Sequence, residues 1–306
     1  MAGHTGTIWD VGFSPDGELA ATASSDGTVR LWNIGAQAEL HRYDLGAPAF
    51  ALEVSPDSGR IIAGEGSGEG TLWLFDTATA ALERSIPGPD LTIAPGAIAL
   101  DASGRHALAA TLDTGTLASR LTLWDLDSGE QLRDYDTAGR VFPFRSAAIS
   151  PDGRLALGGT QDFSDEDLGG ELFLWDLQTG QSIRQFAGHN GPVWSLDMSS
   201  DNRLMASGSS DGSVILWDYA TGEVLRRFAG HTGWVFDVAF SPDGRRLYSA
   251  SADGTVRAWQ VSAWEVADLL DWVQANRHVR EFTCEERAQY RIEPLCAAVG
   301  MLDAEL

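Results

Sequence analysis

Cysteine and long apolar runs are scarce in this sequence, and each scarcity argues against a class of protein. The 306 residues contain only two cysteines, a content typical of reducing compartments, so we expect a cytoplasmic protein. No apolar run approaches the roughly 20 residues of a transmembrane helix, so we expect no membrane span. Met1 to His4 lead directly into a strand-like segment, and no signal peptide is predicted.

Basic residues are also few. Lysine and arginine together number 21, against 44 aspartates and glutamates, and the formal net charge is −23. Nucleic-acid binding requires a basic surface that neutralises phosphates, so we expect no nucleic-acid partner. The charge is consistent with attraction of a basic protein partner, and equally with acidic solubility alone.

Metal and cofactor motifs are missing as well. Cys284 and Cys296 lack the pair of histidines that would complete a zinc site. We therefore predict free thiols and no metal, with a disulfide between the two as the alternative. The sequence has no glycine-rich phosphate loop and no nucleophile elbow, so no cofactor is predicted.

What the sequence does contain is a repeat. His189 and His231 lie 42 residues apart, and so do Trp217 and Trp259. Each copy begins with Gly-His, passes an Asp-Gly pair and ends near the tryptophan. Ser-Pro-Asp-Gly turns separate its strand-like segments, because proline presets φ and glycine accepts a positive φ. A period in the low forties with these motifs is typical of a four-stranded propeller blade.

With these motifs, residues 3–261 resemble the WD-repeat β-propeller family. The resemblance implies an all-β fold, a six-bladed propeller of four-stranded blades, with a short α-helical C-terminal extension. The propeller domain is predicted over residues 1–261, with copies at about 3–45, 46–87, 88–137, 138–186, 187–228 and 229–261. Copies two to four have degenerate motifs and longer glycine-rich or acidic loops.

Closure of the ring is the open question, because the sixth copy has only three strand-like segments. We predict a closed ring whose sixth blade is completed or covered by the C-terminal tail. Seven blades are commonest in the family, so the alternative is that the sequence is the C-terminal part of a longer protein.

In this family a loop His, a strand Ser or Thr, a turn Asp and a strand Trp form a hydrogen-bonded chain across the blade. By resemblance we assign His4, Ser24, Asp26 and Trp32; His189, Ser209, Asp211 and Trp217; and His231, Ser251, Asp253 and Trp259. The alternative hydroxyls on the same strand faces are Thr22, Ser207 and Ser249. A His–Ser–Asp set also invites a catalytic-triad interpretation, but its repetition favours a structural role.

The tail, residues 262–306, carries no repeat motif. A capping box at Ser262 and Glu265 precedes apolar residues at helical spacing, so we expect a helical tail packed on the propeller. The run from Glu285 to Cys296 resembles the C-terminal end of bacterial WD-repeat proteins in large signalling chains.

One position of the inner strand is the expected binding site. In this family it lies at the mouth of the central channel, on the face of the Gly-His loops, and aromatic residues and arginine are common hot spots. The expected partner-binding residues are Trp9, Phe50, Arg145, Trp194 and Phe236, with Trp234 further out on the same rim. The alternative is that these side chains turn inward and fill the channel.

These observations favour a non-catalytic protein–protein interaction scaffold, or the sensor lobe of a bacterial signalling protein. The partner would be a protein or peptide with basic residues, and the chain a monomer or part of a longer chain. The alternative is a hydrolase or lyase built on the propeller, with its site in the central channel. We expect no enzyme, because the remaining histidines, His41, His106 and His278, lack repeated partners.

Overall fold

A computed structural model describes residues 3–66, 70–88, 92–112, 119–135, 143–160 and 169–261. The chain divides into two compact units, Met1–Val261 and Ser262–Leu306, and the second unit lies outside the described residues. The predicted helical tail, its packing and both cysteines therefore fall outside the described part. Every regular element in the described ranges is a strand, and they contain no helix long and apolar enough to cross a membrane.

The described strands form antiparallel sheets, each built from strands consecutive in sequence. The first sheet contains β1 (Ile8–Phe13), β2 (Leu19–Ser24), β3 (Thr28–Asn33) and β4 (Ala38–Asp44). The second contains β5 (Ala49–Val54), β6 (Arg60–Glu65), β7 (Leu72–Asp76) and β8 (Leu82–Ile86). The third contains β9 (Thr92–Leu100), β10 (His106–Leu112), β11 (Ser119–Asp125) and β12 (Gln131–Tyr135).

The remaining sheets follow the same order. The fourth contains β13 (Phe144–Ile149), β14 (Leu155–Thr160), β15 (Leu172–Asp176) and β16 (Ser182–Phe186). The fifth contains β17 (Val193–Met198), β18 (Leu204–Ser209), β19 (Val214–Asp218) and β20 (Val224–Phe228). The sixth has three strands in the described part, β21 (Val235–Phe240), β22 (Arg246–Ser251) and β23 (Val256–Gln260). The architecture is a six-bladed all-β propeller, as the repeat predicts.

Tight turns connect the strands of each blade. After β1 the N–H of Gly17 donates to the carbonyl of Ser14 at 2.9 Å. Gly17 has a φ of +71°, and Gly27, in the Asp-Gly turn before β3, has a φ of +83°. Glycine adopts this left-handed conformation without the steric penalty that other residues meet. The glycines of both motifs therefore determine where each strand ends.

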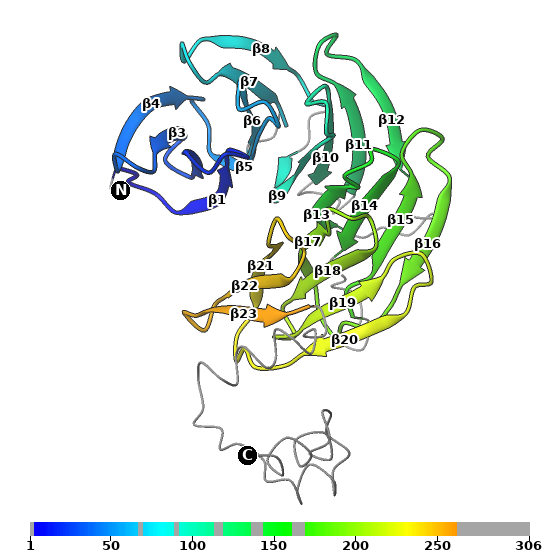
Figure 1. Cartoon of the computed structure of the whole chain (residues 1–306). Helices are drawn as coiled ribbons and strands as arrows, with labels where there is room; N and C mark the ends of the chain where they lie inside the picture. Colours follow the sequence, from blue (N-terminus) through cyan, green and yellow to red (C-terminus); the bar gives the residue numbers. More distant parts are fainter. Residues whose placement is uncertain are drawn as a thin grey trace, which may run out of the picture. The chain divides into compact units, whose positions relative to one another are not determined.

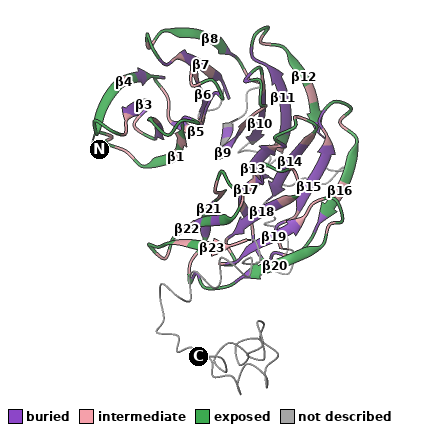
Figure 2. Cartoon of the chain, viewed as in Figure 1, coloured by how far each residue is buried: buried purple, intermediate pink, exposed green. Residues whose placement is uncertain are grey.

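The hydrophobic core lies between neighbouring blades. Leu31 and Tyr43 of the first sheet pack with Leu52 and Phe75 of the second. Four further clusters fill the other junctions between consecutive sheets. The middle strands are therefore buried, whereas the outer strands are largely exposed (Figure 2). The outer strands are β4, β8, β12, β16 and β20.

The ring of blades is open between the first and the sixth sheets (Figure 1). The inner strands of consecutive sheets pack side by side from β1 to β21. Within the described ranges, no core cluster joins the sixth sheet to the first. The described residues alone therefore leave the ring open, and the predicted completion of the sixth blade by the tail falls on residues 262–306, outside the described part. Closure depends on polypeptide that completes the sixth blade, and the described part contains none.

Candidate functional site

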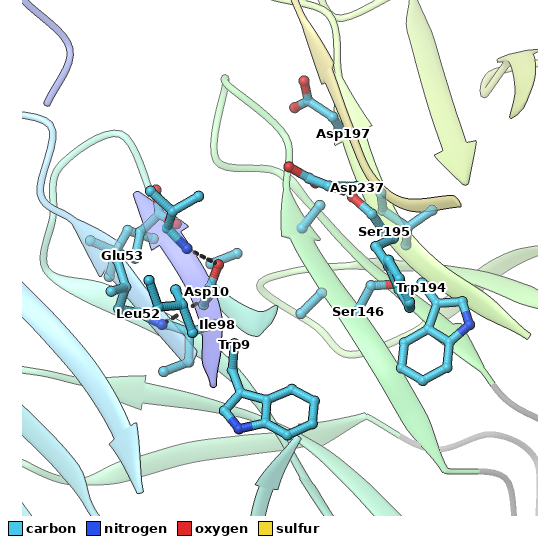
Figure 3. A pocket seen from close by; sticks show the side chains of 18 of the residues that line it. Trp9, Asp10, Leu52, Glu53, Ile98, Ser146, Trp194, Ser195, Asp197 and Asp237 are labelled. Carbon is cyan, nitrogen blue, oxygen red and sulfur yellow. Dashed lines mark hydrogen bonds between the residues drawn. The ribbon is translucent and has the colours of Figure 1, made fainter. Parts of the chain in front are cut away.

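The inner strands surround a cavity of about 850 Å³. Its lining residues come from β1, β5, β9, β13, β17 and β21, or lie next to these strands. Figure 3 shows the indole rings of Trp9 and Trp194 at the same end of this cavity. Both residues lie near the start of an inner strand, so the cavity opens where the chain enters each blade. We call this end the channel mouth.

Trp9 and Phe50 form one aromatic group at the channel mouth. Their ring centroids lie 5.3 Å apart, and each is the second residue of its inner strand. Phe50 packs directly on Gly66, where any side chain would collide with the ring. Trp9 lines the cavity and is about half exposed, whereas Phe50 is less exposed and contacts the ring of Trp9.

Trp194, Trp234 and Phe236 form a second aromatic group, contributed by the fifth and sixth sheets. The rings of Trp194 and Trp234 stack with centroids 5.8 Å apart and an interplanar angle of 18°. Phe236 meets both rings edge-on, with centroids 5.8 and 6.1 Å away. Trp234 and Phe236 are about half exposed. The group therefore presents a continuous aromatic surface to solvent.

Arg145 contacts this second group without lining the cavity. Its guanidinium carbon lies 5.4 Å from the centroid of Trp194, a distance typical of a cation–π contact. Of the six predicted binding residues, four line the cavity, namely Trp9, Trp194, Trp234 and Phe236. Phe50 contacts Trp9, and Arg145 contacts Trp194. The acidic loop at 162–167 lies outside the described residues.

Carboxylates that sequence reasoning missed line the same cavity: Asp10, Glu53, Asp197 and Asp237. Asp10 and Glu53 lie on one wall, and Asp197 and Asp237 on the opposite wall (Figure 3). Asp10 and Asp237 share a repeat position, four residues before the serine of the first turn. Glu53 and Asp197 share the position two residues before that serine. Comparison of the aligned inner strands would have found both pairs.

The surroundings of the channel raise the pKa values of these four carboxyl groups. Burial raises the pKa of Asp10 to about 7 and that of Glu53 to about 8, and neighbouring carboxylates add to both shifts. Burial also raises the pKa of Asp197 to about 6. Protein atoms surround the carboxyl group of Asp237 and raise its pKa, although part of the residue still reaches solvent. A cation in the channel would therefore stabilise ionised forms that the protein alone disfavours.

Three blades also contain a hydrogen-bonded chain of four side chains. In the fifth blade, His189 lies 3.2 Å from Asp211 through Nδ1 and 2.6 Å from the Ser207 hydroxyl through Nε2. The indole N–H of Trp217 donates to the same hydroxyl at 2.8 Å. The first blade repeats this chain with His4, Asp26, Thr22 and Trp32, and the sixth with His231, Asp253, Ser249 and Trp259.

The predicted hydroxyl residues, Ser24, Ser209 and Ser251, are wrong, because the alternatives on the same strand faces occupy the chain. Trp217 lies opposite Met205, so its indole reaches the hydroxyl two residues further along, at Ser207. Ser209 instead donates to the carbonyl of Gly191 at 2.9 Å. Ser24 and Ser251 are also occupied elsewhere, because each accepts a hydrogen bond from the backbone N–H of the turn aspartate.

The geometry of these chains suits a structural role. Ser207 is completely buried, and its oxygen already contacts both the imidazole and the indole. Although burial opposes the shift, hydrogen bonds from His189 and its neighbours lower the pKa of Asp211. The pKa values of Asp26 and Asp253 are lowered in the same way, with hydrogen bonds as the cause. The chains hold an ionised carboxylate in each of these three blades.

The remaining described histidines have partners of their own. His106 lies 2.8 Å from Asp101 through Nδ1, and His41 packs edge-on against Tyr43. His278 lies outside the described residues. In the part of the chain that the structure describes, no group of three or more His, Cys, Asp or Glu side chains is arranged to hold a metal ion.

Comparison with known sequences supports the assignment of the repeat. The family model of the WD domain, G-beta repeat, matches residues 1–33, 180–218 and 222–260. These three stretches match the WD40 repeat. The matched stretches include the histidine, aspartate and tryptophan of the hydrogen-bonded chain in the first and fifth blades, and those of the sixth. The second to fourth copies of the repeat lie largely outside them.

Several relatives from eukaryotes are similar to this chain. The serine-threonine kinase receptor-associated protein of Gallus gallus is 25% identical over 249 residues, covering 69% of this chain and 66% of the relative. The periodic tryptophan protein 2 homolog of Schizosaccharomyces pombe is 40% identical over 79 residues, covering 26% and 8%. Eukaryotic translation initiation factor 3 subunit I of Aspergillus oryzae is 31% identical over 135 residues, covering 43% and 40%. The chain thus spans less than two thirds of each relative.

Proposed function

We propose that this protein is a non-catalytic interaction scaffold that binds a protein or peptide at the channel mouth. WD40-repeat propellers generally bind proteins, which supports the broad assignment. The observation that carries the specific site is the lining of one cavity by half-exposed aromatic rings together with four carboxyl groups whose pKa values are raised. Aromatic rings of this kind are typical hot spots of protein interfaces.

The lining favours a lysine or arginine side chain beside an apolar anchor. Trp9 and Trp234 keep about half of their surface exposed, and an indole face attracts a cation. Asp10 and Asp237 lie deeper, where they can accept charge-assisted hydrogen bonds from the same cation. The two kinds of group together would recognise a long cationic side chain that enters the channel with its apolar stem against the rings.

The narrower assignment, a cytoplasmic sensor lobe of a bacterial signalling protein, remains a proposal. It is supported by the sequence between Glu285 and Cys296 and by the low cysteine content. The relatives described above are eukaryotic. Purification of the protein from its natural source, followed by identification of its partners, would test this assignment.

Peptide selection tests the proposed site. The full chain would be immobilised and exposed to a phage library of random peptides, beside the double variant Trp194→Ala/Trp234→Ala. A matched control, Leu82→Ala/Leu225→Ala, removes two exposed apolar side chains from the outer strands β8 and β20. We expect the wild type and the control to select peptides that contain lysine or arginine beside an apolar residue.

The double variant should lose this selection while its melting temperature stays close to that of the control. Retained capture by the variant would refute the site. Loss of capture together with collapse of the fold would assign the two tryptophans to the structure of the propeller instead.

A further inference from the structure

Three of the four carboxyl groups in the channel are hydrogen-bonded to the protein itself. Asp10 accepts two backbone N–H groups, one from its own strand and one from the next blade, each at 2.8 Å. Asp197 accepts two in the same way, at 2.7 and 2.6 Å. Asp237 accepts a hydrogen bond from the hydroxyl of Ser195 in the preceding blade, at 2.8 Å. These bonds connect neighbouring inner strands, so the three aspartates have a structural role.

Glu53, the fourth carboxyl group, has no such partner. No described residue donates a hydrogen bond to it, and burial raises its pKa to about 8, with repulsion from the three aspartates adding to the shift. Among the described residues that line the cavity, none is a lysine, arginine or histidine that could balance its charge. A carboxylate removed from water without a donor costs free energy. Glu53 therefore has a cost for the fold that its own contacts do not offset.

Glu53 also lies deeper in the channel than Asp10. Figure 3 shows both on one wall, with Glu53 further from the ring of Trp9 at the channel mouth. The repeat position of Glu53, two residues before the first turn, is glycine or alanine in four other blades: Gly12, Ala99, Ala148 and Ala239. These small residues leave room for a charged end group at this level of the channel, beside Glu53.

We infer that Glu53 pairs with the cationic end group of the ligand and determines the specificity of the channel. The inference rests on the proposed function and names the residue that selects the ligand of that site. A lysine or arginine side chain enters past Trp9 with its stem against the rings, and its N–H groups supply the donors that Glu53 lacks. A cation on a short stem does not reach this depth, so the site selects lysine or arginine over shorter cationic residues.

Pairing of this kind releases a proton. Without ligand, Glu53 is a neutral acid at pH 7, because its pKa is about 8. A bound ammonium or guanidinium group stabilises the carboxylate, so the carboxyl proton passes to solvent and the ligand keeps its own protons. Affinity should therefore rise with pH up to about 8. The other charged groups near this path are Asp10, Asp197 and Asp237 in the cavity and Arg145 at the channel mouth.

Isothermal titration with a selected peptide that contains a single lysine tests the inference. We expect Glu53→Gln to bind this peptide at least about tenfold more weakly than wild type at pH 7. Asp197→Asn removes a carboxyl group from the opposite wall and should lose less affinity, whereas Glu18→Gln, at an exposed turn, should bind like wild type. Titration in two buffers of different ionisation enthalpy counts the released protons, and the count should fall by about one in Glu53→Gln.

A second peptide tests the depth of the pairing. It contains 2,4-diaminobutyric acid, which keeps the ammonium group on a stem shorter than that of lysine, and it should bind wild type and Glu53→Gln about equally. Equal affinities of wild type and Glu53→Gln for the lysine peptide would overturn the inference, as would equal losses in Glu53→Gln and Asp197→Asn or an unchanged proton count. If wild type still prefers lysine to norleucine in that peptide, the channel site stands and only the role of Glu53 falls. Without that preference the proposed function falls as well.

Discussion

The carboxylate of Asp10 accepts a hydrogen bond from the backbone N–H of Leu52, at 2.8 Å, and so connects the first two inner strands. Asp10→Ala leaves this N–H without a partner and should lower the free energy of unfolding by about 1–3 kcal/mol. Asp10→Asn keeps an acceptor oxygen and should stay near wild type at pH 5. Urea unfolding of the three proteins would measure this difference, and equal stabilities of the two variants would disprove it.

The raised pKa values predict that stability falls as pH rises above about 4, the range in which unfolded carboxylates ionise. Asp10 and Glu53 keep their protons to about pH 7 and 8 in the folded protein. The folded state therefore binds more protons than the unfolded state over this interval, so deprotonation favours unfolding. Asp211 has a lowered pKa, and the stability it contributes is present above about pH 4 and is lost below it. We expect maximal stability near pH 4.

Glu53→Gln removes one of the carboxyl groups whose ionisation lowers stability as the pH rises. At pH 8 the variant should be more stable than wild type by at least about 1 kcal/mol, and at pH 5 it should show no such gain. Glu18→Gln, at an exposed turn, is the matched control and should unfold like wild type at both pH values. A Glu53→Gln variant with the same pH dependence as wild type would contradict the role assigned to the buried carboxyl group.

Removal of a blade histidine should destabilise the fold. His231 is buried and contacts both Asp253 and Ser249, so His231→Ala leaves buried polar groups unpaired and should lower stability by about 1–3 kcal/mol. His189→Ala should behave in the same way, because it breaks the equivalent chain. Thermal melts would show both losses. Unchanged melting in both variants, combined with the loss of a hydrolytic activity, would favour the enzyme alternative.

The difference in exposure between two blades at one repeat position can be tested with a single residue type, valine. Val214 is completely buried and Val256 is 72% exposed, although both occupy the same repeat position. Val214→Ala should lower stability by about 2 kcal/mol through lost burial and packing, whereas Val256→Ala should change it by less than about 0.5 kcal/mol. A comparable loss in both variants, measured by chemical denaturation, would show that the edge is covered in solution.

Much of the fold follows from local sequence. The copy predicted at about 187–228 contains the four strands β17 to β20. Such strands are predictable because turn residues and β-branched residues mark both ends within one copy of the repeat. The six copies likewise correspond to six sheets. Closure was not predictable, because it depends on contacts between the first and the last copies and has no local motif.

The site was only partly predictable. Trp9, Trp194, Trp234 and Phe236 were found because aromatic residues stand out at one repeat position. Asp10, Glu53, Asp197 and Asp237 were missed because they occupy two repeat positions other than the aromatic one. Alignment of the copies shows each pair, and the circular arrangement of the inner strands brings the two pairs to one cavity. The hydroxyl of the hydrogen-bonded chain was misplaced by two residues, since strand register decides which serine the indole reaches.

The most direct test of the account is the affinity of a selected peptide that contains a single lysine or arginine. Isothermal titration would compare this peptide with an analogue in which norleucine or citrulline replaces the cation. We expect the neutral analogue to bind wild type at least about tenfold more weakly, and this difference to shrink in Asp10→Asn/Asp237→Asn. Equal affinities of the two peptides for wild type would contradict a cation-binding channel.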